Sequence, residues 1–334
     1  MDLEAAMRRA DQLSRLGLGL TAPNPIVGAA VIDAAGELVG EGFHQRGDGG
    51  AHAEVNALAA AGNRARGATL VVTLEPCSHQ GKTPPCVTAI IEAGITRVFY
   101  AVSDPNPIAS GGAAQLMAAG IAVESGLLEA QVRFTNRAWL TKIQSNRPLI
   151  TLKIAATLDG RIAAQDGTSK WLTSEAARSD VAVLRSECDA IVTGTGTYKA
   201  DKPQLTVRGV TRTGVTAAFE PARIVIGLSD ISAPEMIQLR THDLNELIEL
   251  SRKSGWNRIL VEAGPTLISV LLRSALFDEI FLYQAPTILG AGATFASDLG
   301  INTLAERLDL DLIASEVIEG TPNNLRTHLV ARRS

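Results

Sequence analysis

The chain has 334 residues, about twice the length of a typical single domain, so two domains are expected. Hydrophobic residues make up 46% of the sequence and charged residues 20%, as in an ordinary globular protein with substantial cores. A net charge of −4 argues against a protein that holds nucleic acid on a broad basic surface.

The N-terminal residues 1–16 alternate charged and apolar side chains and predict an amphipathic helix. The apolar face of this helix would carry Leu3, Ala6, Met7, Ala10 and Leu13. The segment lacks the basic head and apolar core of a signal peptide, and no apolar run approaches the ~18 residues of a membrane span. Three cysteines are too few for a disulfide scaffold. We therefore expect a cytoplasmic protein without a membrane partner.

Short β-rich segments alternate with helical segments after residue 26. The segments 26–33 and 38–43 predict a hairpin with its turn at Ala35-Gly36. Further strands are predicted at 68–75, 97–104 and 121–126, and helices at 53–61, 86–94, 113–120 and 127–142. This order of strands and helices predicts an α/β domain in which helices cover both faces of a sheet.

A polar, proline-containing segment at 143–149 marks a domain boundary, so we predict a first domain at 1–145 and a second at 149–334. The second domain begins with a strand in 149–160. Its other clear α/β segments are 189–198, 222–227, 258–272 and 278–290. The segment after the strand at 190–193 contains two glycines and predicts a Gly-rich loop.

His52, Cys77 and Cys86 form the clearest set of candidate metal ligands. Two thiolates and a neutral imidazole would neutralise Zn²⁺ and leave one tetrahedral position for water, whose pKa zinc lowers to about 7. Glu54 would carry a proton from this water to a substrate nitrogen, so that loss of ammonia completes a hydrolytic deamination. Residues two apart lie about 200° apart on a helix, so His52 and Glu54 can converge only at a helix start.

Each feature also has an ordinary structural explanation. A single histidine often caps a helix, and cysteines in a cytosolic protein are usually buried thiols, as we expect for Cys188. Together, H-x-E and a later Pro-Cys match the zinc deaminase signature, although eight residues separate Cys77 from Cys86 where the signature has two. His79 could instead supply a fourth ligand and close a purely structural zinc site.

Four segments of the first domain, 21–31, 52–58, 73–86 and 104–107, resemble the deaminase half of the bifunctional riboflavin biosynthesis deaminase-reductase family. The long cysteine spacing is that family's own variant. The resemblance implies a cytidine-deaminase-like three-layer α/β/α domain that binds zinc through His52, Cys77 and Cys86 and uses Glu54 as its proton carrier. It also implies the substrate, 2,5-diamino-6-ribosylamino-4(3H)-pyrimidinone 5′-phosphate, and a contact from Asn24 to the pyrimidine edge.

Two features of the second domain suggest a ligand site. Lys153 interrupts an apolar strand, where a buried lysine is costly unless it meets an anion or reaches solvent. A strand, Glu262, Gly264 and a predicted helix follow one another, and a helix start suits a phosphate. A plain strand-to-helix turn is the preferred explanation of the second feature unless other support is found, and the G-x-G at 194–196 is a weak dinucleotide signal by itself.

The segments 152–163, 169–178, 184–201, 203–208 and 261–267 resemble the reductase half of the same family. The resemblance implies a dihydrofolate-reductase-like α/β domain in which NADPH reduces the ribosyl group of the deaminated product to ribityl, and a homodimer. The implied NADPH contacts are Ala155, Trp171, Thr197, Asp201, Gly264, Pro265, Thr266, Leu267, Ile268, Ser269 and Val270. The implied substrate contacts are Ser169, Arg185, Leu205, Arg208 and Glu262. Arg185 and Arg208 could clamp a phosphate, and Glu262 could accept hydrogen bonds from hydroxyl groups.

The second domain departs from the family pattern in three places. Lys202 stands where an aspartate is usual, Leu228 lies where the family has a cofactor-contacting strand end, and the segment 231–259 is shorter. Because of these departures, one alternative is that the chain acts only as a deaminase and has a weakened reductase domain. A polynucleotide deaminase is a further alternative, which the acidic balance disfavours. The last alternative is a non-catalytic protein that senses nucleotides and has a structural zinc site.

Overall fold

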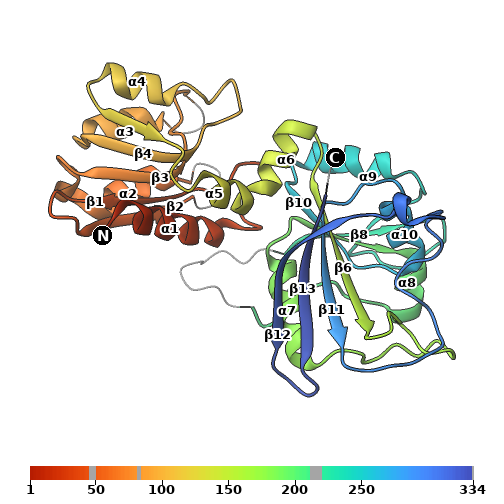
Figure 1. Cartoon of the computed structure of the whole chain (residues 1–334). Helices are drawn as coiled ribbons and strands as arrows, with labels where there is room; N and C mark the ends of the chain where they lie inside the picture. The colour runs from red at the N-terminus through yellow and green to blue at the C-terminus, as the bar shows by residue number, and fades with distance from the viewer. Residues whose placement is uncertain (45–49, 81–83, 211–219, 333–334) are drawn as a thin grey trace. The chain divides into compact units, whose positions relative to one another are not determined.

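The computed structural model describes residues 1–44, 50–80, 84–210 and 220–332. The chain forms two compact units, one spanning Met1–Asn146 and the other made of the described residues from Arg147 onward (Figure 1). The break between them falls within the segment 143–149. Among the described residues, no helix is both long enough and apolar enough to cross a membrane.

The first unit contains a five-stranded sheet in the order β2-β1-β3-β4-β5. The predicted hairpin is confirmed, because β1 and β2 pair antiparallel. Strand β1 is also antiparallel to β3, and β3, β4 and β5 are parallel. The strands are β1 (Gly28–Ile32), β2 (Leu38–Phe43), β3 (Thr69–Leu74), β4 (Arg97–Val102) and β5 (Ala122–Ser125). The buried side chains of β1, β3 and β4 form the centre of the core.

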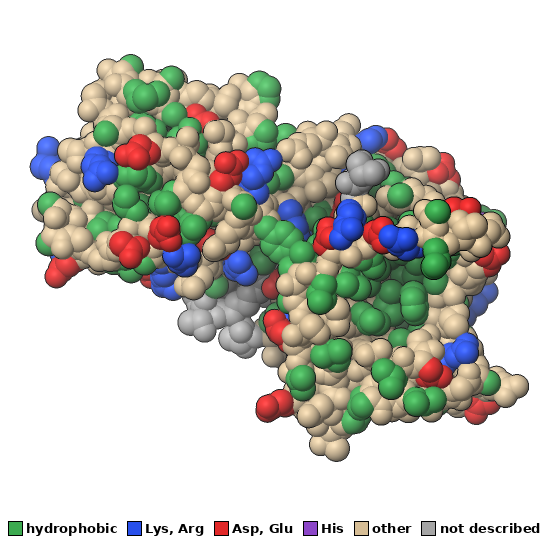
Figure 2. All heavy atoms as spheres, viewed as in Figure 1, with side chains coloured by type: hydrophobic (Ala, Val, Ile, Leu, Met, Phe, Trp, Pro, Cys, Tyr) green, Lys and Arg blue, Asp and Glu red, His purple; other side chains and the backbone are tan. Residues whose placement is uncertain are grey.

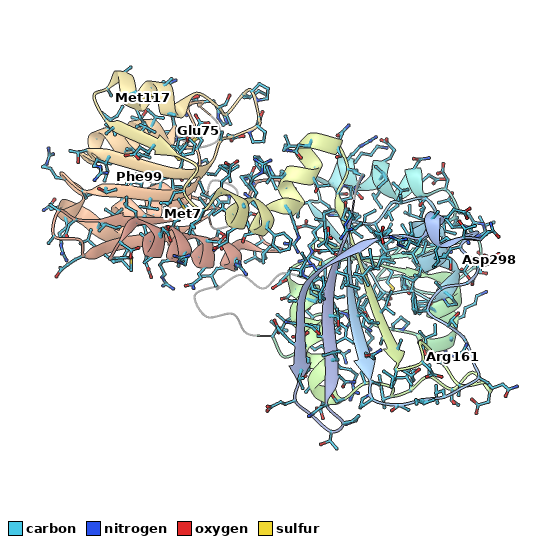
Figure 3. The ribbon with its side chains drawn as sticks, viewed as in Figure 1. Met7, Glu75, Phe99, Met117, Arg161 and Asp298 are labelled. Atoms are coloured by element: carbon cyan, nitrogen blue, oxygen red, sulfur yellow. The ribbon has the colours of Figure 1, made fainter. Side chains whose placement is uncertain are left out.

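Helices cover both faces of this sheet (Figure 1). The helix α1 (Leu3–Ser14) packs on β1 and β3, and its buried residues include Met7 (Figure 3). The helix α2 (Ala53–Ala61) packs on β1 and β2. It comes so close to β2 that a Cβ atom on Gly40 would lie 2.3 Å from the Ala57 carbonyl oxygen. Short helices α3 (Cys86–Glu92) and α4 (Gly112–Ala118) follow in the chain.

The helix predicted at 127–142 is in fact two helices, α5 (Glu129–Thr135) and α6 (Arg137–Ser145). Asn136 separates them with φ −95° and ψ 16°. Its side-chain amide accepts a hydrogen bond from the Ile26 N–H at 3.4 Å and donates one to the Ile26 carbonyl at 3.2 Å. The prediction of one helix was wrong because the pattern of apolar residues does not reveal this side-chain contact with a distant loop.

The second unit contains an eight-stranded sheet in the order β12-β13-β11-β6-β10-β7-β8-β9. Strands β11, β6, β10, β7, β8 and β9 are parallel, and β13 and β12 continue the sheet antiparallel at one edge. The strands are β6 (Leu149–Thr157), β7 (Ala190–Gly194), β8 (Ala222–Ile226), β9 (Ile237–Leu239), β10 (Arg258–Val261), β11 (Glu279–Ala285), β12 (Leu310–Ile318) and β13 (Asn324–Ala331).

Helices also cover this sheet. They are α7 (Glu175–Ser186), α8 (Thr195–Asp201), α9 (Leu244–Ser254) and α10 (Pro265–Arg273), and this unit also has a short 3₁₀ turn at Leu304–Glu306. Two further 3₁₀ turns, Arg15–Gly17 and Gly62–Ala65, lie in the first unit. The predicted Gly-rich loop after β7 was wrong, because α8 begins directly at Thr195. Gly194 and Gly196 have open space around them, so neither marks a tight turn. The segment 231–259 retains a strand, β9, and a full helix, α9.

Candidate active sites

Three candidate zinc ligands converge in the first unit. His52 is the extended residue before α2, Cys77 lies in the loop after β3, and Cys86 is the first residue of α3. The Nδ1 atom of His52 is 3.1 Å from the Cys86 Sγ atom and 3.6 Å from the Cys77 Sγ atom. All three ligand atoms lie within 4.8 Å of one another. The start of α2, the loop after β3 and the start of α3 thus bring together side chains that are up to 34 residues apart in the chain.

The donor set suits Zn²⁺. Both cysteines are buried and share one hydrogen bond, which lowers the pKa of Cys77 to about 4 and raises the pKa of Cys86, so one thiol of the pair is readily ionised. A thiolate is the form that binds zinc. In the part of the chain that the structure describes, His79 does not join this cluster. Three protein ligands leave one position of a tetrahedral zinc ion open, as in catalytic zinc sites.

Glu54 lies in the first turn of α2, so it and His52 meet the requirement that they share a helix start. Its side chain is 4% exposed, and burial raises the pKa of its carboxyl group. The Glu54 carboxyl group lies beside the cluster, because the Cys86 thiol hydrogen-bonds to it. A carboxyl group with a raised pKa next to a metal site is suited to carry a proton.

Residues near the cluster that sequence reasoning missed include His44. Its ring centroid is 5.2 Å from that of His52, and burial lowers the pKa of His44 to about 4, so its imidazole is neutral. Asn24, the predicted pyrimidine contact, is exposed and its N–H donates to the Thr21 carbonyl in a turn. No sequence signal marked His44, because its importance comes only from its position next to His52.

Glu75 organises the loop beside the cluster, and sequence reasoning missed it as well. This carboxylate lies at the end of β3 (Figure 3) and is buried. It accepts hydrogen bonds from the N–H groups of Gly111 and Ala113, each at 3.1 Å, and of Asp104 at 3.2 Å. Burial raises the pKa of Asp104, which follows β4. Glu75 thereby fixes the 104–113 loop against the segment that carries Cys77.

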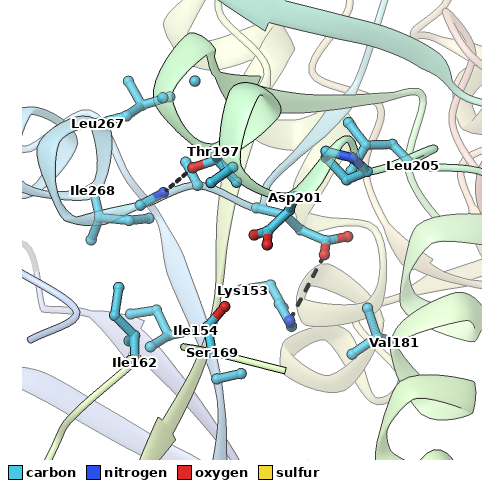
Figure 4. A pocket seen from close by; sticks show the side chains of 18 of the residues that line it. Lys153, Ile154, Ile162, Ser169, Val181, Thr197, Asp201, Leu205, Leu267 and Ile268 are labelled. Carbon is cyan, nitrogen blue, oxygen red and sulfur yellow. Dashed lines mark hydrogen bonds and ion pairs between the residues drawn. The ribbon is translucent and has the colours of Figure 1, made fainter. Parts of the chain in front are cut away.

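A cavity of about 1450 Å³ lies in the second unit, at the C-terminal ends of β6, β7 and β10 (Figure 4). It exceeds the ~300–1,000 Å³ of a typical small-molecule pocket, so it has room for a substrate and a cofactor together. Its walls include all but one of the residues predicted for the reductase half. These are Ala155, Ser169, Trp171, Arg185, Thr197, Asp201, Leu205, Arg208, Glu262, Gly264, Pro265, Thr266, Leu267, Ile268 and Val270.

A partly buried ion cluster occupies one wall of the cavity. The Arg185 guanidinium binds the Glu262 carboxylate through Nε at 2.5 Å and Nη2 at 2.9 Å. The Lys153 ammonium lies 3.8 Å from the same carboxylate, so this partly buried lysine meets an anion, as expected from its place in the strand (Figure 4). Arg185 was predicted to clamp a phosphate, but here its guanidinium is paired with Glu262.

The N-terminus of α10 forms another wall. Gly264 precedes the helix, and its N–H donates to the Thr197 hydroxyl at 2.9 Å (Figure 4). This wall can hold a dinucleotide through its phosphate groups, because the first N–H groups of a helix lack partners within the helix. Ser269 is the exception among the predicted contacts. It is 1% exposed, and its hydroxyl donates to the Pro265 carbonyl and accepts from the Ser297 N–H, so it lies behind the wall.

The remaining predicted positions lie around the mouth of the cavity. Trp171 is 71% exposed, and the Arg178 guanidinium stacks 4.5 Å from its ring centroid. The Asp201 carboxylate is 3.6 Å from the Lys170 ammonium. Of the departures from the family pattern, Lys202 lines the cavity, whereas Leu228 is 58% exposed and lies outside its lining.

Comparisons with known proteins identify the family of both domains. A family model described as "Cytidine and deoxycytidylate deaminase zinc-binding region" matches residues 1–102, and one described as "RibD C-terminal domain" matches residues 148–320. The riboflavin biosynthesis protein RibD of Mycobacterium tuberculosis is 42% identical over 99% of this chain and 98% of its own. The Escherichia coli protein of the same name is 40% identical over 92% of this chain and 94% of its own.

Solved structures give the same result. The structure of Acinetobacter baumannii RibD matches with a TM-score of 0.89 at 35% identity, and 99% of each chain is covered. A Thermotoga maritima protein, described as a diaminohydroxyphosphoribosylaminopyrimidine deaminase/5-amino-6-(5-phosphoribosylamino)uracil reductase, matches with a TM-score of 0.86 at 32% identity and the same coverage. The chain therefore belongs to the RibD family of bifunctional riboflavin biosynthesis enzymes, in which a zinc-dependent deaminase domain is joined to an NADPH-dependent reductase domain.

Proposed function

We propose that residues 1–145 deaminate 2,5-diamino-6-ribosylamino-4(3H)-pyrimidinone 5′-phosphate and that residues 149–334 reduce the ribosyl group of the resulting 5-amino-6-(5-phosphoribosylamino)uracil. The observation that carries the proposal is the convergence of His52, Cys77 and Cys86 beside the buried Glu54 carboxyl group. The Thermotoga maritima relative, which is described as both a deaminase and a reductase of these two compounds, supports this choice of substrates.

In the deaminase site, His52, Cys77 and Cys86 would hold the metal. Bound zinc supplies a water that is acidic enough to act as the nucleophile at neutral pH. Glu54 would accept a proton from the water and deliver it to the 2-amino group, which leaves as ammonia while the ring carbon gains an oxygen. The raised pKa of the buried carboxyl group lets Glu54 hold that proton between the two transfers. The neutral His44 ring packs edge-on against His52 and limits its movement.

In the reductase site, Gly264 to Ile268, Val270 and Thr197 would hold the dinucleotide, and Ala155, Trp171 and Asp201 complete this part of the cavity. NADPH supplies the hydride. Ser169, Leu205, Arg208 and Glu262 would bind the ribosyl substrate. Glu262 would accept hydrogen bonds from substrate hydroxyl groups, because Arg185 holds its carboxylate in the charged form within the wall. We do not extend the cofactor role to Ser269, whose hydroxyl is already bonded behind the wall.

Two assays on the purified zinc-loaded chain test this function. The diaminopyrimidine ribosyl phosphate should release ammonia, and adding NADPH should then give NADPH oxidation. The aminouracil ribosyl phosphate should oxidise NADPH without releasing ammonia. Ammonia release without any NADPH oxidation from either substrate would reduce the function to a deaminase with an inactive second domain. Absence of both signals would contradict the proposed substrates altogether.

We also propose a cytoplasmic homodimer, supported by three free thiols and an apolar sheet face. Figure 2 shows hydrophobic side chains gathered in a hollow over β6 and β11. Leu312 of the edge strand β12 is 63% exposed and pairs in register with the partly exposed Leu329 of β13. This apolar row is suited to pack against a second copy. Sedimentation equilibrium should give twice the chain mass, and Leu312→Asp should shift the chain to a monomer.

A further inference from the structure

Six cationic side chains line the reductase cavity, and the structure divides them into two groups. Four already have partners: Lys153 and Arg185 bind Glu262, Lys170 pairs with Asp201, and Arg178 stacks on Trp171. The other two are Lys202 and Arg208. Within the described part of the chain, neither has a carboxylate at ion-pair distance, and the segment 211–219 contains no acidic residue. These two charges are left for a ligand.

Lys202 is held in place by its backbone. It ends α8 with φ +44°, and its N–H donates to the Tyr198 carbonyl at 2.9 Å. Leu205, three residues later, is 2% exposed and anchors the segment in the core. The Arg185 Nη1 group donates to the Thr206 carbonyl at 3.2 Å. The segment 202–208 is thus held by the core and by the ion cluster. All of its residues except Val207 line the cavity.

We propose that Lys202, together with Arg208, binds the 5′-phosphate of the ribosyl substrate. The inference rests on the proposed function, which places a phosphorylated substrate in this cavity. A phosphate dianion requires cations that are not already neutralised, and an ammonium group binds it as a compact point charge. NADPH also carries phosphate groups, and two of its predicted contacts, Thr197 and Asp201, lie on the helix that ends at Lys202. The other predicted contacts centre on the start of α10, so binding of NADPH is measured below as the competing outcome.

The test compares phosphorylated and dephosphorylated forms of the aminouracil ribosyl substrate. The variant Lys202→Gln keeps a polar, unbranched side chain that is one atom shorter, but removes the charge. We expect its KM for the phosphorylated substrate to rise about tenfold, as for loss of one charge-assisted hydrogen bond, with little change in kcat. The KM for the dephosphorylated substrate should not change. Lys202→Arg should restore most of the lost affinity.

Three controls keep the outcomes distinct. Lys199→Gln removes an exposed charge from the same helix outside the cavity, and should change neither KM. Calorimetric titration of wild type with the phosphorylated substrate comes first, because absence of binding there would contradict the proposed function and not the role of Lys202. Thermal unfolding should show that Lys202→Gln remains folded.

Two results would overturn the role of Lys202. One is an equal rise in KM for both substrate forms, which would mean that Lys202 does not recognise the phosphate. The other is an unchanged substrate KM with a weaker Kd for NADPH, measured by fluorescence titration, which would assign Lys202 to the phosphate groups of the cofactor.

Discussion

Arg185 and Glu262 form a two-point ion pair in the wall of the reductase cavity, with N–O distances of 2.5 and 2.9 Å. The two residues come from α7 and from the end of β10, 77 positions apart in the chain. Lys153 of β6 adds a second cation to the same carboxylate. The Glu262 carboxylate therefore links two strands, β6 and β10, to the helix α7 at the cavity wall.

We predict that Glu262→Gln removes reductase activity but not deaminase activity. The amide leaves Arg185 and Lys153 without a charged partner and can no longer accept hydrogen bonds through two oxygens. We expect NADPH oxidation to fall at least a hundredfold, and the free energy of unfolding to fall by about 3 kcal/mol. Ammonia release from the diaminopyrimidine should stay within twofold of wild type. The matched control is Glu246→Gln, at an exposed position of α9. If Glu262→Gln oxidised NADPH at the wild-type rate, this account would be contradicted.

The Glu262 cluster should also make stability depend on pH. Burial pushes the pKa of Glu262 up, but the charges of Arg185 and Lys153 outweigh it, and the net pKa is lowered. A lowered pKa in the folded state gives stability that is present above the unfolded value of about 4.3 and lost as the pH falls through the folded value. The difference in Tm between wild type and Glu262→Gln should therefore be largest near neutral pH and shrink on acidification below about pH 4. A Tm difference independent of pH would refute this.

Replacing Glu54 with Gln separates a catalytic zinc site from a structural one. The variant keeps all three ligands, so its zinc content by elemental analysis should equal that of wild type. We expect ammonia release to fall by a factor of about 10² to 10⁴, because the amide cannot carry a proton. NADPH oxidation on the aminouracil substrate should be unchanged. Full deamination by this variant would leave zinc with a structural role only.

The sequence predicts a strand well where the side chains of that strand are buried and apolar. The strands from β1 to β5 could be predicted because apolar runs such as Leu70–Val72 are bounded by glycines and polar turns. Strands β12 and β13 could not, because their side chains are largely exposed or paired with ions, as at Arg326, and the apolar alternation is lost. Asn136 broke a predicted helix through a contact with Ile26, which lies 110 residues away.

The zinc cluster was accessible from sequence because its chemistry resides in residue types and its chain turns are marked by Pro76 and Pro85. Glu75 gave no such signal. A glutamate at the end of an apolar strand has many possible partners. Only the folded chain shows that its carboxylate accepts from three backbone N–H groups, two in the loop after β4 and one in the first turn of α4. Positioning residues of this kind are recognised by what they bond to.

We predict that Glu75→Gln weakens the deaminase site without removing its metal. The amide places an N–H₂ group where a carboxylate oxygen accepts a backbone hydrogen bond, so at least one buried N–H loses its partner. An unsatisfied buried donor costs about 1–3 kcal/mol, which a lower urea midpoint should show. The 104–113 loop should then order less well against Cys77, so that KM for deamination rises several-fold while zinc content and NADPH oxidation remain as in wild type. Glu92→Gln, an exposed change on α3, is the control. A lower urea midpoint with an unchanged KM would restrict Glu75 to stabilising the fold, whereas loss of zinc would make it a support for the ligands themselves.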